Sequence, residues 1–226
     1  MVKWNRLPPE MQVKEVKEYY DILCKHKCEL VVKRVFDLVL ATLLLILLSP
    51  IFLILSIMIK LDSKGPVMFR QVRITTNGKK FRIYKFRTMV NNADKLGTQV
   101  TTKGDVRVTR VGRFLRKCRL DELPQLLNII VGDMTFVGTR PEVEKYVNEY
   151  TNEMKATLLL PAGVTSEASI EYKDEERLLE SAKDADNVYI HQVLPEKMRY
   201  NLKAIKNFSL IGELKTMVRT VKAVLK

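Results

Sequence analysis

Asp121 and Glu122 are the two side chains whose type and setting best suit catalysis. On its own, an acidic pair before a helix is ordinary capping, because free backbone amides and the helix dipole favour negative charge there. Here, however, Arg116 precedes the pair and Arg140 follows it. Basic side chains near a helix N-terminus bind phosphate, and Mg²⁺ prefers carboxylate oxygens together with substrate phosphates. The pattern predicts chemistry on a phosphorylated substrate.

A helix is expected to position this pair. Residues 120–130 read LDELPQLLNII, in which Leu and Ile recur at helical spacing. Asp121 suits the N-cap, Pro124 is tolerated only in a first turn, and Gly132 suits the helix end. Adjacent helical residues point about 100° apart. We therefore expect different roles for the two carboxylates, because one can attack phosphorus while the other holds a metal.

Residues 38–59 form an apolar block without a charged side chain, long enough for a membrane helix. Ser49-Pro50 lies at its centre, where proline removes a backbone donor and kinks a helix. Basic residues flank the block on both sides, and positive charge normally marks cytoplasmic flanks. These residues leave two interpretations equally open: a single spanning helix, and a re-entrant helix that bends and returns to the same face.

The segments around the apolar block have their own patterns. Residues 67–89 predict a β-hairpin around Asn77-Gly78, with basic side chains on one face and apolar ones on the other. The second strand is crowded with Lys79, Lys80, Arg82, Lys85 and Arg87. Before the block, Asp37 follows Lys33 by four residues and Arg34 by three, a helical spacing that allows an ion pair.

Further helices are expected along the chain. An amphipathic helix is predicted over residues 10–30, either lying on the membrane surface or leading into the apolar block. Residues 91–119 predict a loop and then a basic helix, with turn or cap positions at Gly104-Asp105 and Gly112. Residues 142–158 and 174–186 read as helices, and the last thirty residues as one or two basic amphipathic helices.

The charge distribution narrows the classes of function. The net charge is +13, and residues 60–120 carry 17 Lys and Arg against 3 Asp and Glu. Such a segment binds phosphorylated substrates, anionic lipid or nucleic acid. No nucleic-acid motif accompanies it, which weakens the alternative of a membrane-anchored module that binds anionic lipid or nucleic acid. A third interpretation is a noncatalytic scaffold, and the intact DELPQ at 121–125 argues against it. The three cysteines match neither a disulfide framework nor a zinc pattern.

Four motifs occur together in a recognisable order. They are Ser49-Pro50, KFRTM at 85–89, DELPQ at 121–125 and GTRPE at 138–142. From about residue 33 to 147 the chain resembles the bacterial sugar transferase family, the monotopic phosphoglycosyltransferases, and the resemblance resumes weakly near 195–225. It implies transfer of a sugar 1-phosphate from a UDP-sugar donor to a membrane polyprenyl phosphate acceptor, with release of UMP, as the first step of surface glycoconjugate synthesis. It gives nucleic acid no role and leaves an oligomer open.

The resemblance also implies roles for individual residues. Asp121 is expected to be the nucleophile that forms a covalent phosphosugar intermediate, and Glu122 to bind the cofactor Mg²⁺. Arg140 and Pro141 match the family's nucleotide-binding motif, although Thr139 replaces its usual first proline. The predicted contacts to substrate phosphates and nucleotide are Lys85, Arg87 and Arg116. Residues 161–179 depart from the family pattern, so no sugar is named.

The expected fold class is α+β, mostly helical, with a small β-hairpin, a re-entrant kinked membrane helix and interfacial amphipathic helices. We expect an N-terminal amphipathic segment over 1–32, the re-entrant helix over 33–60 with its kink at Ser49 and Pro50, and a catalytic region over 61–226. Shared basic flanks and the family's kinked helix favour the re-entrant interpretation. The expected location is the bacterial cytoplasmic membrane, with the catalytic region on the cytoplasmic face and membrane lipid around the helix.

Overall fold

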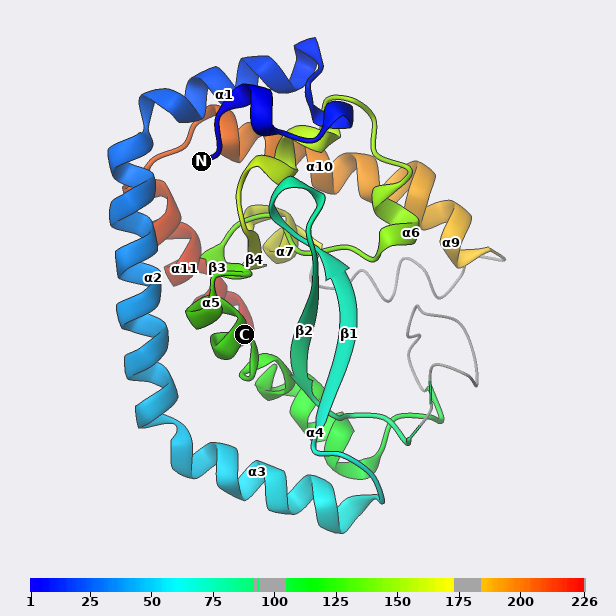
Figure 1. Cartoon of the computed structure of the whole chain (residues 1–226). Helices are drawn as coiled ribbons and strands as arrows, with labels where there is room; N and C mark the ends of the chain where they lie inside the picture. Colours follow the sequence, from blue (N-terminus) through cyan, green and yellow to red (C-terminus); the bar gives the residue numbers. More distant parts are fainter. Residues whose placement is uncertain (92, 94–104, 173–183, 226) are drawn as a thin grey trace.

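The computed structural model describes residues 1–91, 93, 105–172 and 184–225. Helices surround two small sheets of two strands each, which confirms the predicted α+β class. In Figure 1, α2 runs down one side of the molecule, α3 crosses the bottom, and α1 and α10 lie across the top. The hairpin of β1 and β2 stands between these layers.

The apolar block forms two helices, α2 (Lys27–Leu47) and α3 (Ser49–Asp62), with a bend of 61° between their axes. Pro50 lies in the first turn of α3 and cannot donate to the carbonyl of Ile46, four residues earlier. The Ser49 hydroxyl donates to that carbonyl instead, at 2.8 Å. Within the described ranges, no single helix has the length and apolarity to cross a bilayer, whereas α2 and α3 reach both together.

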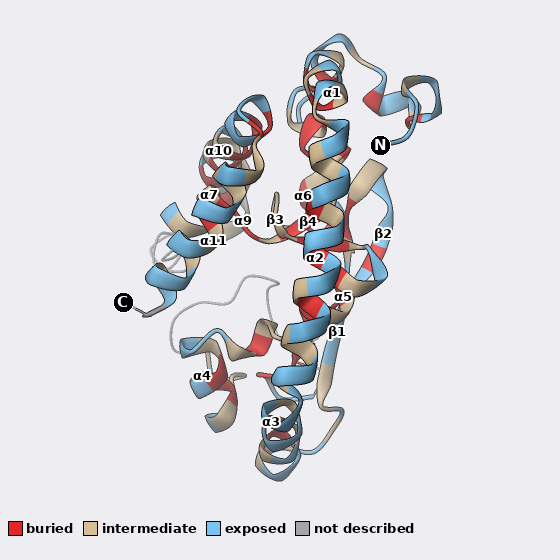
Figure 2. Cartoon of the chain, turned by 90° about the vertical axis from the view of Figure 1, so that its left-hand side faces the viewer, coloured by how far each residue is buried: buried red, intermediate tan, exposed pale blue. Residues whose placement is uncertain are grey.

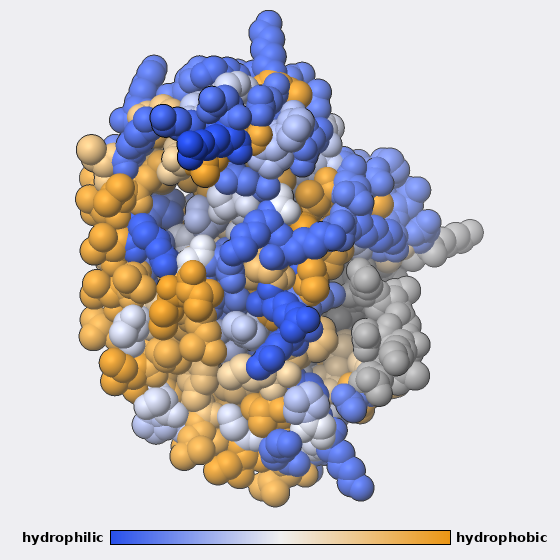
Figure 3. All heavy atoms as spheres, in the orientation of Figure 1, coloured by the Kyte–Doolittle hydropathy of each residue, from blue (hydrophilic) through white to orange (hydrophobic). Residues whose placement is uncertain are grey.

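One face of α2 and α3 is apolar and exposed. Figure 3 shows this face as a continuous hydrophobic surface along the side and bottom of the molecule. Figure 2, which views α2 from outside, shows exposed residues along its whole length. Large apolar side chains in this surface include Val31, Val35, Val39, Leu43, Ile46, Leu47, Leu53, Ile54, Ile57 and Leu61. Water-soluble proteins rarely leave so large an apolar surface uncovered.

The inner face of α2 is polar at its N-terminal end. Lys33 and Asp37 are buried and lie 3.7 Å apart, so the predicted ion pair is confirmed for this partner. Arg34 does not pair with Asp37 in this way. Its guanidinium donates to the carbonyls of Ile129 and Ile130, at 2.7 and 3.0 Å, at the end of α5 (Gln125–Val131). A basic side chain there complements the negative end of the helix dipole.

The predicted hairpin is confirmed. Strands β1 (Met68–Ile74) and β2 (Lys80–Phe86) pair in antiparallel register, and Asn77 and Gly78 both have positive φ in the connecting turn. Phe81 and Ile83 are buried, as the alternation requires. The prediction that the basic residues of this strand share one face is wrong for Lys85, which has the same parity as Phe81 and Ile83 and turns inward.

A second sheet was not predicted. Strands β3 (Met134–Val137) and β4 (Ala162–Thr165) pair in parallel. Gly138 and Gly163 lie so close that a Cβ on Gly163 would come within 2.2 Å of the Gly138 backbone. Each strand has only four residues, too few to show a period, and parallel partners lie far apart in sequence.

Several predicted helices have different bounds. Within residues 10–30, α1 (Lys14–Lys25) ends before α2 begins, and its buried face packs against the 3-10 helix η6 (Met154–Leu159) and α10 (Leu194–Lys206). The prediction of one helix over 142–158 is wrong, because only α6 (Glu144–Val147) and η6 form there. The other α-helices within the described residues are α4 (Arg110–Lys117), α7 (Glu167–Glu171), α9 (Ala185–Val188) and α11 (Leu210–Leu225).

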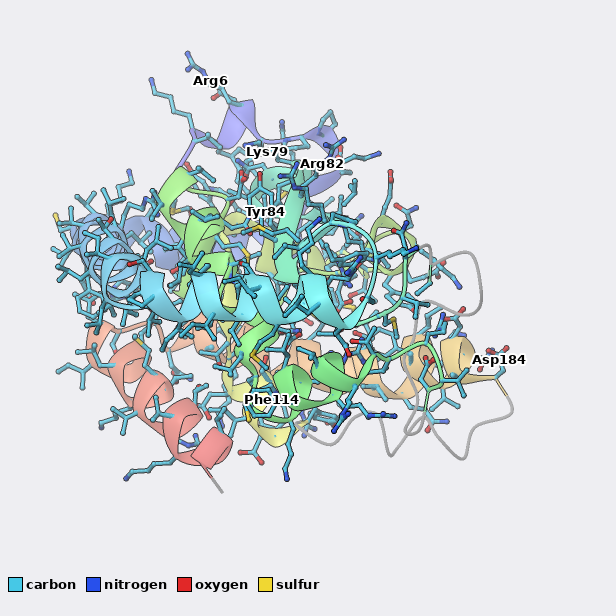
Figure 4. The ribbon with its side chains drawn as sticks, turned by 90° about the horizontal axis from the view of Figure 1, so that it is seen from below. Arg6, Lys79, Arg82, Tyr84, Phe114 and Asp184 are labelled. Atoms are coloured by element: carbon cyan, nitrogen blue, oxygen red, sulfur yellow. The ribbon has the colours of Figure 1, made fainter. Side chains whose placement is uncertain are left out.

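The remaining predictions have different outcomes. The two basic C-terminal helices are confirmed as α10 and α11. Gly104 and most of 174–186 lie outside the described residues. Gly112 is inside α4 rather than in a turn, and a Cβ there would lie 2.0 Å from the Thr88 carbonyl oxygen. Seen from below, α4 with Phe114 lies on one side of α3, and the hairpin residues Lys79, Arg82 and Tyr84 lie on the other (Figure 4).

Candidate active site

The acidic pair lies in a tight turn between two helices. Asp121 and Glu122 belong to the 3-10 helix η5 (Leu120–Glu122), which follows α4 and precedes α5. Arg119 adopts a left-handed conformation, with φ of 55°, and turns the chain between α4 and η5. Non-glycine residues in this region cost about 1–3 kcal/mol and concentrate at functional sites. The predicted N-cap role of Asp121 is wrong, because Arg119 and Pro124 occupy the N-cap positions of η5 and α5, and neither side chain makes a capping hydrogen bond.

Glu122 holds two cations from distant parts of the chain. Its carboxylate accepts hydrogen bonds from Lys85 Nζ at 2.9 Å and from both terminal nitrogens of Arg140, of which Nη1 lies 3.2 Å from Oε2. Burial opposes the ionisation of Glu122, but the charges of Arg140 and Lys85 outweigh it and hold the pKa of this carboxyl well below its ordinary value. Glu122 is therefore an anion at neutral pH, and it fixes both cations.

The pKa values of the two cations shift in opposite directions. Burial lowers the pKa of Lys85, although the charge of Glu122 opposes that shift. Glu122 raises the pKa of Arg140 above its already high ordinary value, so that side chain is always charged. Arg140 also donates to the carbonyl of Val164 in β4 at 3.4 Å. Strand β2, the turn η5 and the chain after β3 thus meet at one carboxylate.

Asp121 has a different environment from its neighbour. It is 8% exposed, and its carboxylate makes no hydrogen bond to any residue in the described part of the chain. Burial raises its pKa, the charge of Glu122 adds to that effect, and the charges of Lys85, Arg116 and Arg140 oppose it. A carboxylate without hydrogen-bond donors but within reach of several positive charges keeps its lone pairs available for attack.

The other predicted site residues divide into two groups. Arg116 acts on Asp121 through its charge, while its Nε donates to the Thr88 hydroxyl at 3.0 Å. Pro141 lies beside Arg140, and its carbonyl accepts a hydrogen bond from Arg73 at 3.1 Å. The structure therefore brings Lys85, Arg116, Arg140 and Pro141 to the same region as the acidic pair.

Arg87 is directed elsewhere. It is 5% exposed, and its guanidinium donates to the carbonyls of Lys64 and Ser63 at 2.7 and 2.6 Å, just after α3. It also contacts the Ser63 hydroxyl at 2.9 Å and the Ile59 carbonyl at 3.4 Å. These contacts tie the end of β2 to the end of α3, and they give no support to the prediction that Arg87 binds the nucleotide.

Gln125 was not singled out from the sequence. It is 1% exposed, and neither its amide nitrogen nor its amide oxygen has a hydrogen-bond partner among the described residues. It follows Asp121 by four residues, in the same DELPQ motif. Buried polar atoms without partners are costly and uncommon, so they often mark sites of function. A glutamine inside an otherwise apolar helical face was the available signal.

The residues present do not by themselves fit a metal held by Glu122. Both of its oxygens already accept hydrogen bonds from Lys85 and Arg140. Within the described ranges, no three Asp, Glu, His or Cys side chains are grouped as metal ligands would be. A Mg²⁺ ion at Glu122 would have to compete with two cations and take most of its ligands from substrate phosphates and water.

Comparison with known proteins bears on this arrangement. The bacterial sugar transferase family model matches residues 28–226. The chain is 36% identical over 197 residues to the UDP-N-acetylgalactosamine-undecaprenyl-phosphate N-acetylgalactosaminephosphotransferase of Aeromonas hydrophila, covering 86% of this chain and 44% of that protein. It is 37% identical over 198 residues to the UDP-glucose:undecaprenyl-phosphate glucose-1-phosphate transferase of Klebsiella pneumoniae, covering 85% of this chain and 40% of that protein.

A shorter relative matches to a similar degree. The UDP-glucose:undecaprenyl-phosphate glucose-1-phosphate transferase of Caulobacter vibrioides is 37% identical over 196 residues, covering 85% of this chain and 69% of that protein. The chain thus spans less than half the length of the Aeromonas and Klebsiella relatives. The family match covers the bent helix pair and the whole cluster around the acidic turn. The chain belongs to the bacterial sugar transferase family.

Proposed function

We propose that this chain transfers a sugar 1-phosphate from a UDP-sugar to a membrane polyprenyl phosphate, giving a polyprenyl-diphosphate-sugar and UMP. The proposal extends to this chain the donor and acceptor classes in the names of its Aeromonas, Klebsiella and Caulobacter relatives. One structural observation carries it. Asp121, a buried carboxylate that accepts no hydrogen bond from the described residues, lies beside Glu122, a carboxylate that fixes two cations.

The reaction proceeds in two successive displacements at the same phosphorus atom. An oxygen of Asp121 attacks the β-phosphorus of the donor, and the bond from that phosphorus to the bridging oxygen of UMP breaks. UMP leaves with the electron pair, and the sugar phosphate is held as an acyl phosphate on Asp121. A phosphate oxygen of the polyprenyl acceptor then attacks the same phosphorus, and the Asp121 carboxylate is released. Covalent catalysis of this type predicts ping-pong kinetics.

The cations around the pair have an electrostatic role in this scheme. An anionic nucleophile and a diphosphate repel one another, and fixed positive charge offsets that repulsion without reorganisation during the reaction. Lys85 and Arg140 are held in place by Glu122, so they are preorganised before the donor binds. Arg116 adds a third positive charge near Asp121.

We also propose that the bent helix pair is embedded in the cytoplasmic membrane as a re-entrant hairpin, with the catalytic region on the cytoplasmic face. The support is the exposed apolar surface of α2 and α3, their 61° bend and the basic residues near both ends (Figure 3). A helix pair that enters and leaves on one face keeps the site at the headgroup plane, where the acceptor phosphate lies.

To test the function, UMP release and covalent labelling are measured for wild-type protein and the Asp121→Asn variant with each of a panel of UDP-sugars. Wild-type protein with polyprenyl phosphate should release UMP from at least one donor and should be labelled covalently by that donor. Asp121→Asn should do neither, since an amide is a poor nucleophile. The matched control is Asp133→Asn, the same change at the far end of α5, where Asp133 pairs with the exposed Lys79 at 3.0 Å. Labelling that persists in Asp121→Asn would refute the nucleophile assignment.

A further inference from the structure

Glu142 is a buried carboxylate next to the Arg140-Pro141 motif, and the mechanism above does not use it. It is 6% exposed. Tyr189 donates its hydroxyl hydrogen to Glu142 Oε1 at 2.5 Å, and Lys197 Nζ lies 3.6 Å from the same oxygen. Lys197 also donates to the Tyr189 hydroxyl at 3.0 Å, and Arg73 Nη1 lies 3.8 Å from the second Glu142 oxygen.

These partners come from widely separated elements. Arg73 belongs to β1, Tyr189 to the π-helix η7 (Tyr189–Val193) and Lys197 to α10. A buried carboxylate costs several kcal/mol unless it is paired, and this one is paired with two cations and a hydroxyl. Strand β1, η7 and α10 are therefore attached, through one side chain, to the segment that carries Arg140.

The backbone of that segment is fixed on both sides. On one side, the Ile74 amide donates to the Glu142 carbonyl at 3.0 Å, and Arg73 donates to the Pro141 carbonyl at 3.1 Å. On the other, the Gly163 amide donates to the Thr139 carbonyl at 2.8 Å. Arg140 lies at the middle of this bridge between β1 and β4, and its guanidinium projects to Glu122.

The fixed backbone of this segment helps to set the position of the Arg140 guanidinium. An arginine side chain is long, and holding it in one bidentate geometry costs rotamer entropy unless its backbone is already fixed. Loss of the Glu142 charge would leave Lys197, which is 6% exposed, and Arg73 without their shared counter-ion, only two residues from Arg140. The attraction that holds the segment to β1 and α10 would then be lost, while Arg73 would still repel Arg140.

We infer that Glu142 is a positioning residue for phosphosugar transfer, acting through Arg140 by holding the 138–142 segment so that the guanidinium stays on Glu122 beside Asp121. The expected effect on the rate of phosphosugar transfer rests on the proposed function. The inference also makes a structural claim that is independent of any activity, because the Arg140–Glu122 contact exists without substrate.

The kinetic test is a double-mutant cycle in kcat/KM for the donor, with Glu142→Gln, Arg140→Lys and the double variant. Residues coupled in one network show interaction energies that correspond to about two- to hundredfold in rate. Glu142→Gln should lower kcat/KM by about tenfold or more in the wild-type background. In the Arg140→Lys background it should lower it by less than about threefold. Equal losses in both backgrounds, or no loss in either, would overturn the inference.

The matched control is Glu144→Gln, two residues further on. Glu144 is half exposed and pairs with Lys80 at 2.7 Å on the surface, so its loss should change kcat/KM by less than about twofold. If Glu142→Gln does not fold, Tyr189→Phe removes the 2.5 Å hydrogen bond while keeping every charge. It should show the same dependence on Arg140 with a smaller loss, and an effect independent of Arg140 would count against the inference.

A crystal structure of the folded variant separates this inference from the proposed function. In Glu142→Gln, or in Tyr189→Phe if the first does not fold, Arg140 should no longer make its two contacts with Glu122. An unchanged Arg140–Glu122 pair would overturn the positioning role even if the wild-type protein transfers phosphosugar. A wild-type protein that releases no UMP from any UDP-sugar would refute the proposed function, whereas a displaced Arg140 would still support the structural claim.

Discussion

Replacing Glu122 by glutamine distinguishes two roles for this carboxylate. Glu122→Gln keeps the size of the side chain and removes its charge. If Glu122 mainly fixes Lys85 and Arg140, as the hydrogen bonds indicate, the variant should lose stability, because two partly buried cations lose their counter-ion. If Glu122 is mainly a Mg²⁺ ligand, the variant should lose its metal dependence with little change in stability.

The size of the loss follows from the geometry. At 2.9 Å and an effective dielectric constant of about 20, the attraction between Lys85 and Glu122 is about 6 kcal/mol before desolvation is subtracted. Removing one partner of a fully buried pair costs about 3–5 kcal/mol. The Lys85 and Glu122 side chains are 22% and 13% exposed, so we expect the lower end, about 3 kcal/mol. In a chain of this length that lowers Tm by roughly 6–12 °C.

The measurement is thermal unfolding of both proteins in the same detergent, at neutral pH and in acid. The depressed pKa of Glu122 contributes stability that is present above the ordinary glutamate pKa and lost as pH falls through the depressed value. The difference in Tm should therefore close in strong acid. The second change Lys85→Met should recover part of the loss, because it removes one unpaired cation. An unchanged Tm at neutral pH, with altered Mg²⁺ dependence, would refute the reasoning.

Three further results are expected. Because burial raises the pKa of Asp121, the acid limb of the kcat/KM profile for UMP release should begin above the ordinary range of an aspartate; a limb within that range would contradict the nucleophile's environment. Arg87→Met should lower stability by about 2–4 kcal/mol in thermal unfolding and leave the donor KM unchanged, since its contacts tie β2 to the end of α3. A raised KM with unchanged stability would restore its predicted nucleotide role. Labels on both chain ends should react only from the cytoplasmic side, and reaction from opposite sides would indicate a spanning helix.

Local patterns predicted the elements whose cause is local. The Asn77-Gly78 turn needs two positive φ angles, and the flanking alternation needs a pleated strand, so the hairpin was readable from a short window. The kink at Pro50 follows from a missing backbone donor, and Ser49 satisfies the freed carbonyl within the same turn. The parallel pairing of β3 and β4 was missed, because four-residue strands carry no period of their own.

At the acidic turn, the sequence determined some features and only the tertiary structure determined the others. The sequence by itself determined that Asp121 and Glu122 are adjacent, that basic motifs flank them, and that the chain resembles phosphosugar transferases. It placed Asp121 as a helix cap, whereas the left-handed Arg119 turn puts the pair inside a 3-10 helix. Only the tertiary structure decided that Lys85, 37 residues away, and Arg140, 18 residues away, both bind Glu122, while Asp121 has no hydrogen-bond partner in the part of the chain that the structure describes. The physical reason is that an ion pair depends on distance in space, which packing between separated elements sets, whereas spacing along the chain sets only the local turn.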